Sequence, residues 1–295
     1  PMSGFSTLRR FVLSAVMLGF AAHAAAAPAP LTLDVYNPGA AAIFPVSSVL
    51  VSGDKDAILV DAQFGKAQAQ QVVDKIRASG KHLTTIYISH GDPDYYFGLE
   101  TLTQAFPDAK VMAPGPVVEH INQTKDAKLA FWGPQMGADM PQKLIVPQVL
   151  KGNTLDLEGH ELDIVGLSGR QPDRTFVWIP SIKAVVGGVV VADNLHVWMA
   201  DTQTPQSHKQ WLATLKRIDS LQPKIVVPGH YLGDSDRSMK AVYFTRDYIK
   251  AFDEEALKAS NSGELIAAMK KRYPDLGEES SLELSAKVAK GEMKW

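Results

Sequence analysis

A short run in the first third of the chain gathers side chains suited to acid–base or metal chemistry. Residues 85–88 are apolar or β-branched, as in a buried strand, and Pro93 then breaks the strand before a helical pattern begins. His90, Asp92 and Asp94 alternate along this turn, so an extended backbone would point all three to one side. In open α/β sheets, ligands bind at the carboxyl ends of strands, and this turn is therefore the first candidate site.

The surrounding elements form two successive halves, each running from strands through a helix to a strand that ends in a histidine. The second such strand ends in Pro228-Gly229-His230. Apart from the strand before His90, the strands are expected at 31–36, 47–52, 57–61, 110–113, 144–149, 154–157, 161–167, 175–179, 184–192 and 224–227. Six helices are expected: around 69–76, from Leu99 onward, at 116–130, from Pro205 onward, at 236–258 and at 263–272. Residues 131–142 are expected to form a long loop or lid.

The run around His90 resembles the signature of the metallo-β-lactamase-fold hydrolases, His-any-His-any-Asp-His at a strand end, followed closely by Gly. One version of that signature reads Thr-His-Gly-His-Pro-Asp-His-Tyr-Phe-Gly, and this chain keeps His90, Gly91, Pro93, Asp94, Tyr96, Phe97 and Gly98 of it. It carries Asp92 and Tyr95 where the family has metal-binding histidines. The resemblance spans residues 31–260 and implies an α/β (α+β) fold, the four-layered αβ/βα sandwich with its site along one edge.

The resemblance also implies a ligand set, in which His230 matches the family's last metal histidine. The family's next histidine lies before the strand at 175–179, where this chain has Ser168 or Arg170 instead, depending on the alignment. The metal-bridging aspartate is missing as well, because residues 186–189 read Val-Gly-Gly-Val. We therefore expect either a single divalent ion, which would be zinc or else manganese or iron, or no metal ion at all. Its ligands would be His90, Asp92, Asp94 and His230.

The chemistry of such a site suggests roles for individual residues. Asp94 would orient a metal-bound water or take its proton, and Tyr95 would donate a hydrogen bond to a developing oxyanion. Asp61, at a strand end, is a candidate brace for the site, or simply a turn carboxylate. Three residues are candidates for substrate binding: Arg170, His196 and Trp198.

Two functions follow from these assignments. The first is an exported metal-dependent hydrolase that acts on a small ester, lactone, amide or related substrate through metal-activated water. The second is a metal-free, non-catalytic protein that binds a small molecule in the same cleft. An arginine in the place of the metal, Arg170 or Arg174, in contact with Asp92 or Asp94, would favour the second function.

Composition limits the cellular context. The chain has 295 residues, a net charge of −2 and no cysteine, which excludes disulfides and thiolate metal ligands. Residues 1–27 have the pattern of a secretory signal, a pair of arginines before a short apolar stretch and small residues, leaving one domain at 28–295. We expect a bacterial periplasmic or secreted protein with a small-molecule substrate, no nucleic-acid partner and no membrane span in the mature chain. The sequence does not determine the oligomeric state.

Overall fold

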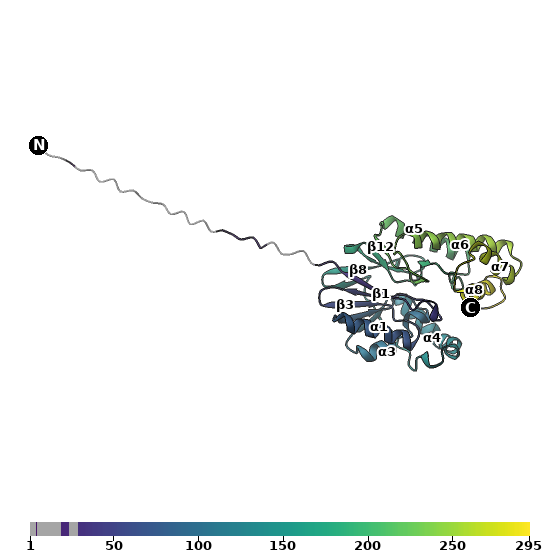
Figure 1. Cartoon of the computed structure of the whole chain (residues 1–295), viewed down its shortest axis with the longest axis horizontal. Coiled ribbons are helices and arrows are strands. Elements are labelled where there is room, and N and C mark those ends of the chain that lie inside the picture. The colour runs from purple at the N-terminus through teal and green to yellow at the C-terminus, as the bar shows by residue number, and fades with distance from the viewer. Residues whose placement is uncertain (1–3, 5–18, 24–28) are drawn as a thin grey trace.

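Two β-sheets stacked face to face form the centre of the molecule, and helices cover the outer side of each sheet (Figure 1). The structure is a computed structural model that describes residues 4, 19–23 and 29–295. Most of the expected export signal at 1–27 lies outside these residues. The arrangement is the four-layered αβ/βα sandwich, so the expected fold class is confirmed.

The first sheet has six strands in the order in which they occur in the chain. They are β1 (Thr32–Tyr36), β2 (Ser48–Ser52), β3 (Asp56–Val60), β4 (His82–Tyr87), β5 (Lys110–Ala113) and β6 (Gln148–Val149). β1 to β3 pair antiparallel and β3 to β6 pair parallel, so helices must carry the chain across between the parallel strands. These helices are α1 (Lys66–Ser79), α2 (Pro93–Tyr96), α3 (Leu99–Ala105) and α4 (Gly115–Met136).

The second sheet has five strands in the order β12-β10-β9-β8-β7. They are β7 (Thr154–Leu157), β8 (His160–Val165), β9 (Phe176–Ile179), β10 (Ala184–Val186) and β12 (Ile225–Val226). A separate parallel pair, β11 (Ala192–Asp193) with β13 (His230–Tyr231), lies at the edge where the site forms. The helices of this half are α5 (Pro205–Leu221), α6 (Lys240–Lys258), α7 (Ser262–Arg272) and α8 (Glu279–Ala289). Single 3-10 turns occupy η1 (Gly39–Ala41), η2 (Gly137–Asp139) and η3 (Pro180–Ile182).

Four sequence predictions were wrong. The expected strand at 144–149 forms only at its end, as β6 (Gln148–Val149). The expected loop at 131–142 is helical up to Met136, because α4 continues through Pro134. The expected strand at 184–192 ends at Val186, because Gly187 and Gly188 turn the backbone with φ of +67° and +79°. Helix α8 lies beyond 263–272, the last helix that the sequence predicted.

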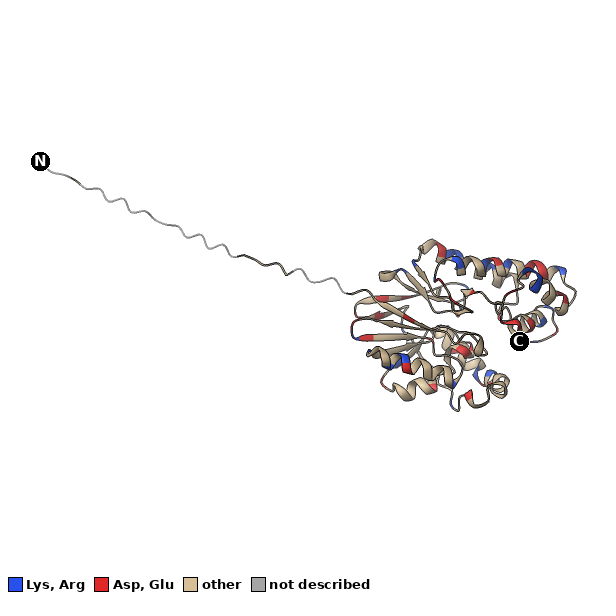
Figure 2. Ribbon diagram, viewed as in Figure 1, with Lys and Arg blue, Asp and Glu red and all other residues tan. Residues whose placement is uncertain are grey.

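The inner faces of the two sheets share one apolar core. Val60 and Tyr87 from the first sheet and Val177 and Val186 from the second are all fully buried in it. Charged residues of both signs alternate along the outer helices, while the strands between them carry few (Figure 2). Among the described residues, no helix combines the length and apolar character needed to cross a bilayer.

Candidate functional site

Asp61 fixes the turn that carries His90. It follows β3 with a left-handed backbone, φ +71°, and its carboxylate accepts hydrogen bonds from Ser89 N at 2.8 Å and Ser89 Oγ at 2.7 Å. Ser89 Oγ in turn accepts a bond from Gly188 N at 2.7 Å, which ties the turn to the second sheet. Burial raises the pKa of Asp61 to about 7, although the bonds from Ser89 oppose the shift. The position of this carboxylate is compatible with the brace role expected from the sequence.

The four expected metal ligands lie in two separate pairs. Asp94 Oδ2 is 2.6 Å from His230 Nε2, a close ion-pair distance. His90 Nδ1 accepts a bond from the backbone N–H of Asp92 at 3.2 Å and lies 3.7 Å from Asp92 Oδ2. The first pair lines an aromatic pocket and the second lines a polar cavity, with Asp92 reaching both.

Tyr95 lies between the two histidines and is fully buried. Its ring packs edge-on against His90, with centroids 5.1 Å apart, and against His230 at 5.7 Å. Its hydroxyl donates to the carbonyl of Gly188 at 2.9 Å, and burial raises the pKa of Tyr95 well above its ordinary value. In this position Tyr95 supports the two imidazoles from beneath, and its only proton is already engaged.

The arginine that reaches the cavity is Arg174, whereas Arg170 is exposed on the same loop. Arg174 is 6% exposed and its Cζ lies 4.6 Å from the centre of the Trp211 ring. Burial lowers the pKa of Arg174, while the charge of Asp201 favours the protonated form. Burial together with the positive charge of Arg174 lowers the pKa of His90 to about 3, so His90 is a neutral imidazole near pH 7.

Asp201 is a site residue that the sequence analysis missed. It accepts hydrogen bonds from Trp198 Nε1 at 3.1 Å and Trp295 Nε1 at 2.8 Å. Asp201 is exposed on the cavity, but the protein around it and the negative charge of Asp92 raise the pKa of its carboxyl to about 7. No local motif marks this aspartate, because Trp295 and Asp92 come from distant parts of the chain.

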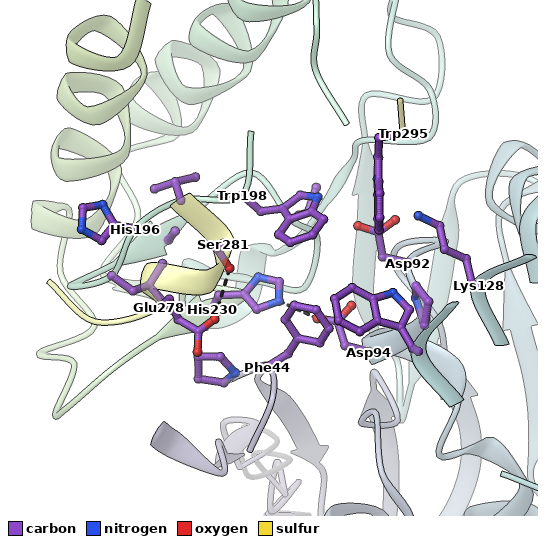
Figure 3. A pocket seen from close by; sticks show the side chains of 17 residues that line it. Phe44, Asp92, Asp94, Lys128, His196, Trp198, His230, Glu278, Ser281 and Trp295 are labelled. Atoms are coloured by element: carbon purple, nitrogen blue, oxygen red, sulfur yellow. Dashed lines mark hydrogen bonds and ion pairs between the residues drawn. The ribbon is translucent and has the colours of Figure 1, made fainter. Parts of the chain in front are cut away.

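The remaining substrate-binding candidates differ in their surroundings. His196 is buried, with Nδ1 2.9 Å from the hydroxyl of Tyr248, and burial lowers its pKa. Trp198 is at the rim, where its ring centre lies 5.3 Å from that of Trp295 and 5.9 Å from that of Phe44. Figure 3 shows Phe44, Trp198 and Trp295 around the Asp94 and His230 side chains.

The site is thus a cleft with two chambers. The aromatic pocket is walled by Phe44, Trp132, Trp198, Trp295 and the Asp94–His230 pair. The polar cavity has a volume of about 250 Å³ and is lined by His90, Asp92, His120, Thr124, Lys128, Asp173, Arg174, Ala200, Asp201, Gln203 and Trp295. Asp92, Lys128 and Trp295 belong to both walls, so these three residues form the partition.

The residues present do not fit the metal centre that the resemblance implies. Among the described residues, no three His, Asp or Glu side chains are arranged to hold an ion. A Cβ at Gly188, where the family has its bridging aspartate, would lie only 2.2 Å from the carbonyl oxygen of Thr175. The guanidinium of Arg174 also places a positive charge in the wall that His90 and Asp92 share, which opposes a second cation.

Comparison with known proteins places this fold in a family. The model of the metallo-beta-lactamase superfamily matches residues 42–230, and the chain belongs to this superfamily. Its scaffold is accordingly that of a metallo-hydrolase, in a family whose members generally bind divalent metals such as zinc.

Individual relatives are distant. The uncharacterized protein YobT of Bacillus subtilis (strain 168) is 35% identical over 71 residues, which cover 24% of this chain and 30% of that protein. The metallo-beta-lactamase family protein TTHA1429 of Thermus thermophilus is 16% identical with a TM-score of 0.62, covering 88% of this chain and 92% of its own. The metallo-beta-lactamase of Pontibacter korlensis is 18% identical with a TM-score of 0.51, over 75% and 93% of the two chains. At these identities the solved structures show the shared fold.

Proposed function

We propose that this chain binds a small molecule in the two-chambered cleft without using a metal ion. The observation that carries this proposal is the position of Arg174, whose buried guanidinium lies in the wall shared by His90 and Asp92. A fixed positive charge at that place can attract a ligand by itself, as a metal ion would in the family. Among the described residues, no three His, Asp or Glu side chains are arranged to hold the metal ion that was expected to activate water.

Hydrolysis of a small ester, lactone or amide is the second candidate, favoured by the Asp94–His230 pair. Burial alone would lower the pKa of His230, but the charge of Asp94 and its hydrogen bond raise it. With Nε2 held by Asp94 at 2.6 Å, the other ring nitrogen would take a proton from an attacking water. The pair faces the aromatic pocket, where the apolar part of such a substrate would lie.

Elemental analysis of the untagged protein, before and after incubation with zinc, manganese and iron(II), tests the proposal. We expect less than a stoichiometric amount of each metal and an unfolding temperature that EDTA leaves unchanged. A bound metal that is lost in His90→Ala and in His230→Ala would refute the metal-free cleft. Hydrolysis of a panel of esters and lactones that survives EDTA but is lost in His230→Ala would establish the second candidate.

We also propose, on the sequence pattern alone, that residues 1–27 direct export and are removed. N-terminal sequencing of the protein recovered from the periplasm of a bacterial host should give a mature chain that begins at Pro28. An uncleaved cytoplasmic product would contradict this.

A further inference from the structure

Arg174 is buried without an acceptor for its hydrogen bonds. Its Nε and Nη2 have no hydrogen-bond partner among the described residues, although the side chain is only 6% exposed. A guanidinium remains charged in proteins, and leaving such a donor unpaired in the interior is costly. Stacking on Trp211 covers one face of the group and supplies no acceptor in its plane. Arg174 lines the cavity, so the accessible part of its guanidinium is where an oxygen acceptor could pair with it.

The acids of the cavity do not supply that oxygen. Asp92, Asp173 and Asp201 all line the cavity, yet in the described part of the chain none forms an ion pair with Arg174. Asp201 already accepts hydrogen bonds from two indole N–H groups. Three carboxyl groups in one small chamber also disfavour a ligand with several negative charges.

Helix α4 lines the same cavity with hydrogen-bonding side chains. His120, Thr124 and Lys128 are spaced by four residues, which places them on one face of the helix. Lys128 Nζ lies 3.6 Å from the centre of the Trp295 ring, so its positive charge is held at the partition. Gln203 lines the cavity together with these groups. This wall can bond to hydroxyl groups as well as to one carboxylate.

We propose that the polar cavity binds a small, hydroxylated monocarboxylate whose carboxylate pairs with Arg174. The assignment deepens the metal-free binding function proposed above and rests on it. Arg174 and Lys128 supply the charge, the side chains of α4 and Gln203 bond to the hydroxyls, and the volume of about 250 Å³ limits the ligand to a small molecule.

Calorimetric titration of the full chain in EDTA buffer, with gluconate, lactate and benzoate, tests this. Each acid is compared with its neutral counterpart: sorbitol, lactamide and benzamide. We expect gluconate or lactate to bind at least tenfold more tightly than its counterpart, and benzoate to bind more weakly than the hydroxylated acids. Equal binding of acid and counterpart, or no binding by either hydroxylated acid, overturns the proposal, as does a preference for inorganic phosphate.

Two variants locate the binding. Arg174→Met should lower the affinity for the hydroxy acid at least tenfold. Arg217→Met, which replaces an exposed arginine on α5, should leave this affinity unchanged. If Arg174→Met does not fold, the test passes to Lys128→Met, at a half-exposed position. This variant must still lower the affinity for the acid and leave the affinity for its neutral counterpart unchanged. An affinity that neither change alters refutes the site. Because EDTA is present, a metal found by elemental analysis would refute the metal-free function separately.

Discussion

At the scale of single residues, the two histidines of the cleft have opposite electrostatic settings. Arg174 and burial hold His90 as a neutral imidazole, while Asp94 favours the protonated form of His230. A ligand therefore meets a neutral imidazole beside a fixed cation in one chamber and a carboxylate–imidazole pair in the other. A single metal ion bound to His90, Asp92, Asp94 and His230 would have removed this difference between the two chambers.

The carboxyl of Asp61 should make stability depend on pH. Its pKa is about 7 in the folded chain and 3.8 in the unfolded chain, so the folded state holds a proton that the unfolded state releases between these values. The contribution is full below pH 3.8 and is lost as the pH rises through 7. Asp61→Asn removes this dependence, which amounts to at most about 4 kcal/mol. Urea unfolding across this pH range should show a smaller loss of stability in Asp61→Asn than in the wild type or in Asp234→Asn, an exposed control.

Gly188 should not tolerate a side chain. An added Cβ would meet the Thr175 carbonyl at 2.2 Å, and φ is +79°. We expect Gly188→Ala to reduce the free energy of unfolding by more than about 2 kcal/mol, and Gly188→Asp to destabilise the chain without creating metal binding. Gly137→Ala is the matched control, since its φ of +58° is similar but nothing lies within 4 Å of the added carbon. Equal losses in the two alanine variants would show that the contact at Gly188 is absent.

At the scale of elements, sequence periodicity located most strands and helices, and the errors have physical causes. Pro134 suggested a loop, but a proline removes only one backbone donor, and Trp132 and Met136 bury themselves on either side of it. The candidate site was only partly predictable. The run at His90 could be found because its residues are adjacent in sequence. Arg174 could not be told from Arg170, because only the folded loop between β8 and β9 shows which of the two reaches the cavity.

The loop that carries Asp201 is held by a histidine between two helices. His208 on α5 has Nδ1 2.6 Å from Asp253 Oδ1 on α6, and Nε2 2.8 Å from the Thr202 carbonyl oxygen. His208→Ala leaves that buried carbonyl unpaired, and we expect a loss of about 1–3 kcal/mol together with faster hydrogen exchange at residues 199–204.

A matched control shows whether the effect of His208→Ala is specific to this buried histidine or follows the loss of any histidine–aspartate pair. His82 lies 3.2 Å from Asp56 but its side chain is 71% exposed, so His82→Ala should change stability by less than about 0.5 kcal/mol. Unchanged exchange at 199–204 in His208→Ala would show that other contacts hold Asp201.

At the scale of the whole molecule, the core between the sheets makes the two halves a single folding unit. The cleft lies at the edge where both sheets end, so its geometry depends on how the sheets are stacked. Asp94 and His230, from different halves, can remain at 2.6 Å only while the inner faces stay packed.

Val177→Ala tests this dependence. The fully buried Val177 packs in the core formed by both sheets, and its truncation should cost about 2 kcal/mol, whereas Val149→Ala, at a 54% exposed position, should cost less than about 0.5 kcal/mol. Because the core is shared, hydrogen-exchange protection should fall equally in β3 and β4 of the first sheet and in β9 and β10 of the second. A loss confined to the second sheet would mean that the halves unfold independently. The cleft would then open between them without global unfolding, and its ligand would stabilise the stacking of the sheets.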